Sequence, residues 1–400
     1  MRTYILRQNG KERGMKNLLF YLAVAVGFLL GFGSGGFQVV LINIGETFEL
    51  TNATMGTVVA MKYAALIVMP PLFGFVSDKV GKKPILIIFM SIITTGYFVA
   101  SFAPSQMVFM SGIFLVGAGY GVSECLFTAA LSDSDPDKAE KKINVMQAFF
   151  NIGAVSSPLI VSFLMSRDVG WPVAFILVGV GFALLLPILL FTTFHEIHLK
   201  QQIVKSQAST SKLFGSKLFV LIFVSLLVYA GLEIGVAYFA DSFLTVELVA
   251  PRFGGLAISI FWFSTIMSRL MFSRLNIDAL RAVYLLYGLT FFGFVALALN
   301  SSLALTLILY AVVGFLMGPL WGLLMATATK SFASQSGAVA SVLTAGCGTG
   351  AMLFPIVLGL VADGFGLRAS MVLLAGFSML VFLQGRWALR RRWQDTNHLA

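Results

Sequence analysis

The sequence predicts an all-α membrane protein with twelve transmembrane helices, arranged as two six-helix, pseudo-symmetric halves. Composition is the first observation behind this prediction. Hydrophobic residues make up 58% of the 400 residues and charged residues only 11%, whereas soluble domains carry roughly 25% charge. The second observation is a series of long, continuous apolar runs separated by short polar loops. The third is one longer polar interruption near the middle of the chain.

Each apolar run is long enough to cross a bilayer, which takes roughly 20 residues of helix. Helices are expected because a chain in lipid must satisfy its backbone hydrogen bonds internally. The first run is longer than the apolar region of a signal peptide and ends without an A-x-A-like cleavage site, so we expect it to be retained. The predicted spans are 18–41, 54–76, 84–103, 107–131, 143–166, 171–194, 217–243, 254–273, 281–299, 302–327, 336–362 and 368–389.

The formal net charge of +10 follows the predicted topology. If the N-terminus is cytoplasmic, nearly all lysines and arginines fall in inner loops and tails. The exceptions are Arg167, Arg252 and Arg368 in outer loops, and Lys62 within a span. This asymmetry is what the positive-inside rule requires, with both termini in the cytoplasm. The basic charge therefore does not indicate nucleic-acid binding.

The polar interruption predicts the division into halves. Its residues, from about His195 to Ser216, are rich in Gln, Ser, Thr and Lys, which is typical of a flexible linker. We expect an N-terminal six-helix half at 1–194, a cytoplasmic linker at 195–216 and a C-terminal six-helix half at 217–400.

No residue pattern indicates an enzyme, a cofactor or a metal site. Cys125 and Cys347 both fall inside predicted spans, so no disulfide framework is expected. The sequence has no phosphate-binding loop and no nucleophile–base arrangement. His195 and His198 lie in the predicted linker, where we expect solvated loop side chains rather than metal ligands.

A basic hairpin joins the second and third spans, with the sequence G-F-V-S-D-K-V-G-K-K-P from Gly74 to Pro84. Glycine at 74 allows a helix to approach a neighbour closely, and Gly81 permits a tight turn. An aspartate at 78 is suited to the N-terminal end of a neighbouring helix, where free amides favour an anion. The alternative is a positive-inside loop that happens to contain glycines.

This hairpin, in a chain with about a dozen spans, resembles that of the major facilitator superfamily transporters, roughly G-x-x-x-D-x-x-G-R/K-R/K. The resemblance implies alternating access between two halves. It also implies that Asp78 contacts the start of the eleventh span in one conformer and leaves it in the other. The matching residues, to which the resemblance assigns conformational gating, are Gly74, Asp78, Gly81, Lys82 and Lys83.

Glu124 is the most informative acid inside a predicted span. Gly117, Gly121 and Glu124 are spaced at i, i+4 and i+7, so they share one helical stripe. A charged, unpaired carboxyl would be costly there, so we expect Glu124 to be protonated part of the time. That is the property a proton-coupled carrier needs; the alternative is a carboxyl held in a structural hydrogen bond.

Polar residues in the fifth and seventh spans are candidate solute contacts. Gln147 and Asn151 are one turn apart, and two amides suit a neutral polyol because they offer donors and acceptors without charge. The alternative is that they join neighbouring helices. In the seventh span Glu233 is followed by Tyr238, with Asp241 near the outer end.

Several patterns resemble the fucose-permease-type branch of the superfamily, whose members are sugar–proton symporters. They are Glu124 after a glycine-rich run, Asn144-x-x-Gln147 with Gly153-Ala154, Gly231-x-Glu233, and the run around Trp262 and Arg269. The resemblance implies that Glu124 is the proton site and Gln147 a sugar contact. Two departures bear on stoichiometry and substrate: Gln38 stands where such carriers can have a carboxylate, and Ser268 stands in place of a glycine.

Lys62 has no counterpart in that pattern. A lysine inside a span indicates function, and a partner is expected. Counted from the outer helix ends, Lys62, Gln38 and Glu233 lie at similar depth at ~1.5 Å per residue. We therefore predict a Lys62–Glu233 pair that closes the outer gate, or a Lys62 that is ready for an anionic substrate. The alternative is that Lys62 extends to the outer headgroups.

The favoured function is import of a small polar solute, a sugar or sugar-like compound, together with protons. Glu124 would take the proton, and Gln38, Gln147, Asn151, Glu233, Tyr238 and Trp262 would contribute to solute binding. Lys62 and Arg269 join the gating residues. The first alternative is proton-driven efflux of amphipathic compounds, and the second is a non-transporting receptor on the same scaffold. We expect a monomer in the plasma membrane whose partners are solute, protons and lipid.

Overall fold

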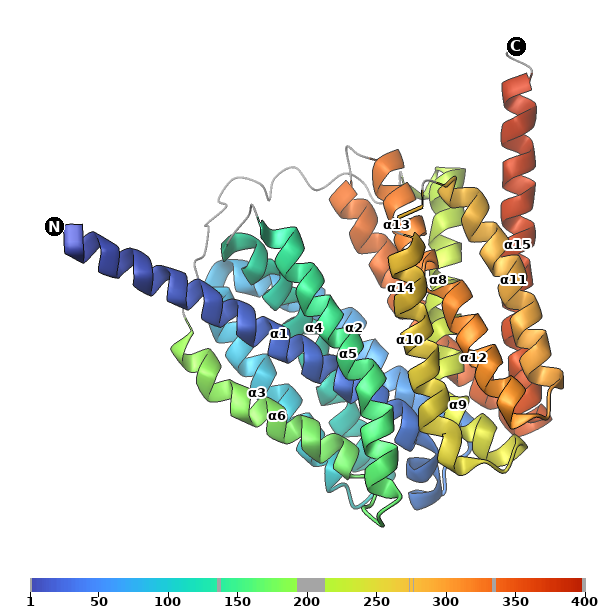
Figure 1. Ribbon diagram of the computed structural model, residues 1–400, viewed down its shortest axis with the longest axis horizontal. Helices are drawn as coiled ribbons and strands as arrows, with labels where there is room; N and C mark the ends of the chain where they lie inside the picture. Colours follow the sequence, from blue (N-terminus) through green and yellow to red (C-terminus); the bar gives the residue numbers. More distant parts are fainter. Residues whose placement is uncertain are drawn as a thin grey trace. The chain divides into compact units, whose positions relative to one another are not determined.

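The computed structural model of the chain describes residues 2–134, 138–192, 213–272, 274–275, 277–332 and 336–397 (Figure 1). Within these ranges every regular element is a helix, and twelve helical spans are long and apolar enough to cross a membrane. The predicted all-α membrane fold with twelve spans is therefore confirmed. Most of the predicted linker at 195–216 lies outside the described residues.

Apart from the stretch between α6 and α8, most of which lies outside the described residues, long helices follow one another with short connections (Figure 1). The first six are α1 (Arg2–Thr47), α2 (Asn52–Val80), α3 (Lys82–Ser101), α4 (Gln106–Ser134), α5 (Ala139–Met165) and α6 (Val173–Phe191). The chain continues with α8 (Lys217–Tyr238), α9 (Ala240–Ser242), the π-helical turn η3 (Phe243–Glu247), the 3₁₀ turn η4 (Pro251–Phe253), α10 (Gly254–Phe272), α11 (Ala279–Leu299), α12 (Leu303–Met317), α13 (Leu320–Ser331), α14 (Ser336–Phe365) and α15 (Leu367–Asn397).

Two predicted spans are interrupted where one continuous helix was expected, and the first, predicted at 18–41, is part of the longer helix α1. The seventh, predicted at 217–243, ends as α8 at Tyr238, and the chain goes on through α9 and η3. The tenth, predicted at 302–327, consists of α12 and α13 with a break at Gly318 and Pro319. Proline has no N–H to donate and its ring crowds the preceding turn, so the break falls where the helical ladder is weakest.

The described helices form two compact units. The first contains residues 1–40 and 61–199, and the second contains 41–60 and 200–400. This grouping differs from the predicted halves only around the α1–α2 connection and the linker. Residues 41–60 join the second unit because the start of α2 packs on α14, as described below. The boundaries of the pseudo-symmetric halves stay a prediction.

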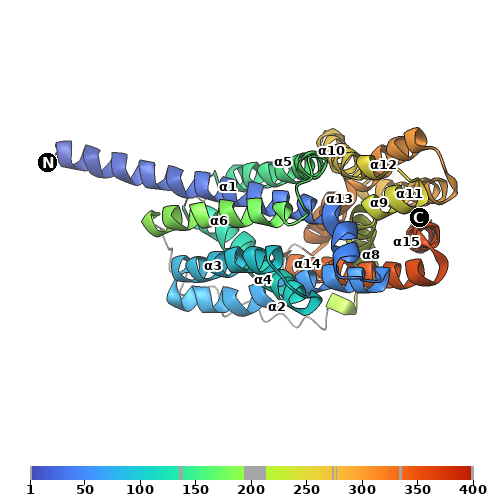
Figure 2. The ribbon, with the colours of Figure 1, turned by 90° about the horizontal axis from the view of Figure 1, so that it is seen from below.

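Aromatic rings fill the core of the first unit. Here α3 packs against both α4 and α6 (Figure 2). The Phe175 ring of α6 lies 5.6 Å from Phe37 of α1 and 5.7 Å from Phe109 of α4, measured between centroids. Tyr97 of α3 stacks on Phe182 at 6.1 Å. Ring pairs at these separations add to the stability gained from buried area alone.

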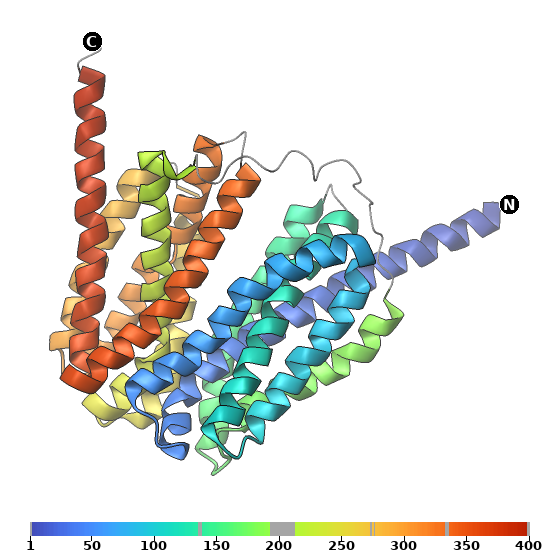
Figure 3. The ribbon, with the colours of Figure 1, turned by 180° about the vertical axis from the view of Figure 1, so that it is seen from behind.

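Helix pairs and side-chain-to-backbone hydrogen bonds build the second unit. In it α8 lies beside α14 (Figure 3), while α11 packs on α15 and α10 on α12. The Tyr287 hydroxyl of α11 donates to the carbonyl of Ser225 in α8 at 2.6 Å, and the Ser378 hydroxyl of α15 donates to the carbonyl of Tyr287 at 2.7 Å. Hydrogen bonds of this kind, from hydroxyl groups, hold helices together in lipid, where the hydrophobic effect between helices is weak.

Asp363, near the end of α14, caps the N-terminus of α2. Its carboxylate accepts the backbone N–H of Asn52 at 2.7 Å, the Asn52 side-chain amide at 2.9 Å and the N–H of Ala53 at 2.8 Å. Glycines bring the helices this close, since a Cβ at Gly359 would lie 2.1 Å from the Asn52 carbonyl oxygen, and one at Gly56 would lie 2.0 Å from that of Pro355. The carboxylate thus satisfies amides that a helix start leaves free.

Asp241 is a buried acid just beyond the end of the apolar span Lys217–Tyr238. Its side chain is 5% exposed and lies against Gly254 at the start of α10. Burial, together with the negative charge of Glu46 at the end of α1, raises the pKa of Asp241 from 3.8 to about 7. Tyr310 of α12 also interacts with this carboxyl.

We expect loss of the Asp363 cap to destabilise the second unit. Asp363→Ala removes three hydrogen bonds to a charged group, and a lost cap costs about 1–2 kcal/mol. Asp363→Asn keeps one accepting oxygen and should lose less. Thermal unfolding in detergent measures both variants against the parent chain. Equal stability of Asp363→Ala and the parent would contradict the capping role.

We expect Asp241 to make the stability of the protein depend on pH. Because the pKa is higher in the folded state than in the unfolded chain, the folded state holds a proton that the unfolded state has released between about pH 4 and pH 7. Protonation of Asp241 therefore makes its full contribution to the free energy of unfolding below that window. The contribution is lost as the pH rises through about 7, and the loss is at most about 4 kcal/mol at roughly 1.4 kcal/mol per pKa unit.

The variant Asp241→Asn removes this titration. Unfolding temperatures are measured from pH 5 to pH 8. As the pH rises, the unfolding temperature of the variant should increase relative to that of the parent chain. Asp168→Asn, an exposed carboxylate changed in the same way, is the control. A difference between Asp241→Asn and the parent that stays constant over this range would refute the assignment.

Candidate functional site

Polar side chains gather inside each unit at one place. We call the group formed by Ser34, Lys62, Tyr120, Glu124 and Gln147 the lysine cluster, and the group formed by Tyr229, Glu233, Arg269 and Gly318 the arginine cluster. The first lies in the first unit and the second in the second unit.

Lys62 lies at the centre of the lysine cluster. Its side chain is 2% exposed, and Nζ donates to the Ser34 hydroxyl of α1 at 3.0 Å. Nζ also lies 5.1 Å from the centre of the Tyr120 ring and 5.7 Å from that of Tyr63, within the range of cation–π attraction. The alternative that Lys62 extends to the outer headgroups is therefore wrong for this structure, because the ammonium points inward among α1 and α4.

The glycine stripe of α4 sets this geometry. A Cβ at Gly117 would lie 2.1 Å from the Lys62 carbonyl oxygen, and one at Gly121 would lie 2.8 Å from the Pro70 ring. Both glycines therefore face α2, which can approach α4 only because neither carries a side chain. The close packing brings the Lys62 side chain to Tyr120, one turn before Glu124.

Glu124 and Gln147 are brought together from α4 and α5. The Gln147 side-chain amide donates to Glu124 Oε1 at 3.2 Å, and both residues are half-buried. The charges of Glu124 and Lys62 act on each other across the cluster. Asn151, also half-buried, follows Gln147 by one turn of α5. The cluster thus combines an acid, a cation and an amide from three helices.

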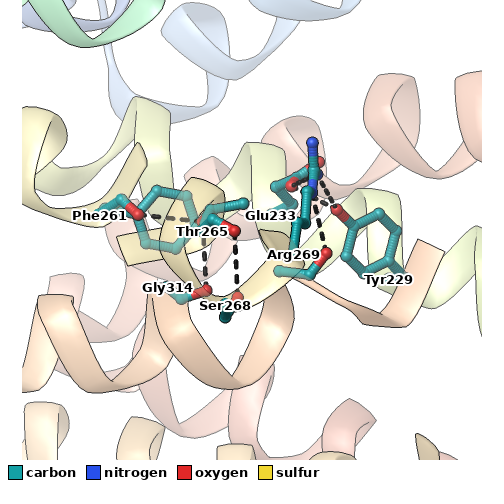
Figure 4. A network of polar contacts seen from close by, with 8 residues as sticks. Tyr229, Glu233, Phe261, Thr265, Ser268, Arg269 and Gly314 are labelled. Atoms are coloured by element: carbon teal, nitrogen blue, oxygen red, sulfur yellow. Dashed lines mark hydrogen bonds and ion pairs between the residues drawn. The ribbon is translucent and has the colours of Figure 1, made fainter. Parts of the chain in front are cut away.

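The arginine cluster joins α8 to α10 (Figure 4). Arg269 Nη2 lies 3.3 Å from Glu233 Oε1 and 3.1 Å from the Tyr229 hydroxyl, which itself donates to Glu233. Arg269 Nε donates to the Gly318 carbonyl at 2.9 Å, at the break between α12 and α13. One guanidinium therefore links three segments, with the Glu233 side chain only 12% exposed.

Ser268 and Thr265 hold α10 next to that break. The Thr265 hydroxyl bonds to the carbonyls of Phe261, at 3.0 Å, and Gly314, at 3.1 Å, and Ser268 bonds to the carbonyl of Thr265 at 3.0 Å (Figure 4). A Cβ at Gly318 would lie 2.0 Å from the Ser268 hydroxyl. The serine that replaces the expected glycine thus occupies the space next to Gly318.

Other predicted solute-binding residues lie within packed helices. Gln38 is 1% exposed and Tyr238 is fully buried. Trp262 packs its ring edge-on against Phe261 at 5.5 Å. Their roles in solute binding stay predictions.

The predicted Lys62–Glu233 pair would join the two units, and it stays a prediction. Lys62 bonds to Ser34 and Glu233 pairs with Arg269, so each has its partner within its own unit. Tyr229 lies one turn before Glu233 on α8, and Arg269 reaches Glu233 from α10. A pairing in another conformer stays a prediction.

The hairpin residues behave in different ways. Gly81 adopts φ 100°, a left-handed conformation that glycine adopts without strain. Lys82 Nζ lies 2.6 Å from Asp133 at the end of α4, and Lys83 Nζ donates to the Leu190 carbonyl of α6 at 2.7 Å. An added Cβ at Gly74 would meet no described atom within 4 Å, and the close approach predicted there stays a prediction. The Asp78 side chain lies outside the described residues.

Sequence reasoning missed Ser34, Tyr120 and Tyr229. Tyr229 precedes Glu233 by four residues, so helical spacing would have placed the two side chains on one face. Tyr120 likewise precedes Glu124 by four. No comparable signal marks Ser34, because its partner comes from another helix.

The sequence profile described as Major Facilitator Superfamily matches residues 23–276. The chain is similar to the probable metabolite transport protein CsbC of Bacillus subtilis (strain 168), 23% identical over 181 residues, which are 43% of this chain and 39% of the relative. It is also similar to the galactose-proton symporter of Escherichia coli (strain K12), 26% identical over 154 residues, 38% of this chain and 33% of the relative. The chain thus spans well under two thirds of the length of these relatives.

Solved structures share the fold. The nucleoside transporter NupG, in a mutant form, superposes with TM-score 0.79 at 18% identity, covering 92% of this chain and 99% of NupG. The E. coli fucose:proton symporter FucP, also a mutant form, gives TM-score 0.62 at 15% identity, covering 92% and 98%. At these identities the likeness shows the fold alone.

We expect the effects of changing Glu233 and Arg269 on the free energy of unfolding to be non-additive. Replacing Arg269 by Gln leaves a mostly buried carboxylate without its cation, and we expect a loss of about 1–3 kcal/mol. The double variant Arg269→Gln/Glu233→Gln should lose less than the sum of the single changes. Unfolding free energies of the four proteins measure the coupling.

The exposed pair Arg281–Asp278, at 3.3 Å, is the matched control for this cycle. Its side chains are 60% and 54% exposed, so its coupling should be under about 1 kcal/mol. Additive losses at Glu233 and Arg269 would rule out a coupled pair.

Proposed function

Because the chain belongs to the Major Facilitator Superfamily and is therefore a membrane transporter rather than an enzyme, we propose that it imports a small polar solute together with protons. The solute is a sugar or a sugar-like compound. Transport proceeds by alternating access in the plasma membrane, with both termini in the cytoplasm and a monomer as the working unit.

The hydrogen bond between Glu124 and Gln147 is the observation that carries this proposal. A half-buried carboxyl in a membrane helix is costly when charged, so binding of a proton is favourable when the site closes. The amide beside it changes partners readily, because it can donate to a carboxylate or accept from a carboxylic acid or a solute hydroxyl. Protonation of Glu124 and solute contact at Gln147 are thereby linked.

The other predicted residues have separate parts in this mechanism. Asn151 extends the polar stripe of α5 beside Gln147. Glu233 and Arg269 hold α8 and α10 together, and a solute that competes for either would loosen them. Gly81, Lys82 and Lys83 fix the α2–α3 hairpin to α4 and α6 at one membrane face, a rigid end about which the helices can move.

Several relatives support the substrate class. The similar proteins include the galactose-proton symporter of E. coli and an inositol transporter of Arabidopsis thaliana, and also a gentisate transporter of Corynebacterium glutamicum, whose substrate is an acid. A proton that crosses a potential of 100 mV supplies about 2.3 kcal/mol. That energy supports roughly forty-fold accumulation of a neutral solute at one proton each.

We expect added solute to acidify proteoliposomes that contain a pH-sensitive dye. Pools of sugars and sugar derivatives are added outside, and one pool should cause acidification that follows proton entry. In Glu124→Gln liposomes the signal should fall by at least about ten-fold, since the proton has no carboxyl to bind. Asp168→Asn, a matched change in an exposed turn where asparagine is readily accepted at φ 62°, should transport normally.

If no pool causes acidification with the parent protein, the result would count against proton-coupled import. Acidification of the lumen as amphipathic dyes loaded inside leave in exchange for protons would then favour the efflux alternative. Acidification that persists in Glu124→Gln would keep import but remove Glu124 from it.

A further inference from the structure

Lys62 is a buried cation with few partners among the described residues. An ammonium has three N–H donors, yet Nζ makes one described hydrogen bond, to Ser34, and otherwise faces the rings of Tyr63 and Tyr120. No described carboxylate lies at ion-pair distance from it. Buried charges are normally paired or hold a ligand, so this ammonium has capacity for an anion.

Glu124 is the acid whose charge acts on Lys62. It lies on α4, one turn after Tyr120, and is held by the amide of Gln147 rather than by the ammonium. The remaining titratable groups around the two are phenols, from Tyr63 on α2, Tyr97 on α3 and Tyr120 on α4, and phenols are neutral at physiological pH. The local charge is therefore decided by Lys62, Glu124 and whatever binds there.

We propose that the transported solute is a small organic anion with one carboxylate or a comparable single negative charge, which binds Lys62 while Glu124 carries the coupled proton. This inference rests on the proposed function of the same site. It replaces a neutral sugar by a sugar acid or a similar acid as the substrate class. Ser34 is a positioning residue that directs Nζ toward the solute.

Charge balance makes the coupling obligatory. In the empty carrier the ammonium of Lys62 balances the carboxylate of Glu124, and the net charge is zero. In the loaded carrier the anion balances Lys62, and the proton neutralises Glu124, so the net charge is again zero. A carrier with the anion but no proton, or with the proton but no anion, would move a buried net charge through the membrane, which is costly.

This balance predicts electroneutral transport. One proton and one monovalent anion enter together, so no net charge crosses and the membrane potential does not drive uptake. A neutral solute that enters with a proton would carry one positive charge and would respond to the potential. The two substrate classes are therefore distinguished by the effect of voltage on the same protein.

The test uses full-length protein in liposomes with an internal pH dye. One pool holds glucuronate, galacturonate, gluconate and 4-hydroxybenzoate, and the matched neutral pool holds glucose, galactose, sorbitol and 4-hydroxybenzamide. Potassium and valinomycin set the potential to zero or to negative inside. Protein-free liposomes give the passive leak, which is subtracted.

We expect acidification with the acid pool alone, at rates that differ by less than about two-fold between the two potentials. Lys62→Gln should lower this rate at least about ten-fold, the equivalent of one charge-assisted hydrogen bond, and Lys62→Arg should retain more of it because the positive charge stays. If Lys62→Gln fails to fold, Ser34→Ala still tests the site. It should raise the half-saturating concentration of the acid several-fold with little change in maximal rate.

Acidification by the neutral pool, with a rate that rises several-fold at negative-inside potential, would overturn this inference and leave the proposed function standing. Acid uptake that is unchanged in Lys62→Gln would also overturn it. If neither pool causes acidification, both the proposed function and this inference would be overturned.

Discussion

A charge inside a membrane protein needs a partner, and both polar clusters of this chain are built around that constraint. Arg269 satisfies it with Glu233, the Tyr229 hydroxyl and the Gly318 carbonyl. Lys62 satisfies it only in part, with Ser34 and aromatic faces. The arginine cluster is complete by itself, whereas the ammonium of the lysine cluster makes one described hydrogen bond and can donate more. That difference is the reason why we propose the lysine cluster, rather than the arginine cluster, as the site of the solute anion.

The same constraint governs the backbone. Helix ends and breaks expose N–H and C=O groups that water cannot reach within lipid. Inside a span, the guanidinium of Arg269 meets a carbonyl at the α12–α13 break. At an exposed helix start, the carboxylate of Asp363 meets the free amides of α2. Charged side chains thus hold irregular backbone in place. Breaks of this kind are where helices of a carrier can bend without losing hydrogen bonds.

The fold is shared with solved carriers named for nucleosides and for fucose, so the scaffold does not select the solute. Selection must come from individual side chains on that scaffold. In this chain Lys62, Glu124 and Gln147 supply a cation, a titratable acid and an amide within one unit. A solute that matches all three would combine hydroxyls with a negative charge.

The sequence by itself determined the class, because continuous apolar runs and the placement of lysines and arginines reflect the bilayer directly. It also identified the stripe of Gly117, Gly121 and Glu124, since helical spacing is fixed by the backbone. Only the tertiary structure decided which partners meet. The bonds of Lys62 to Ser34 and of Arg269 to Gly318 join different helices, between residues 28 and 49 positions apart, and the rotation of each helix depends on packing that no local pattern encodes.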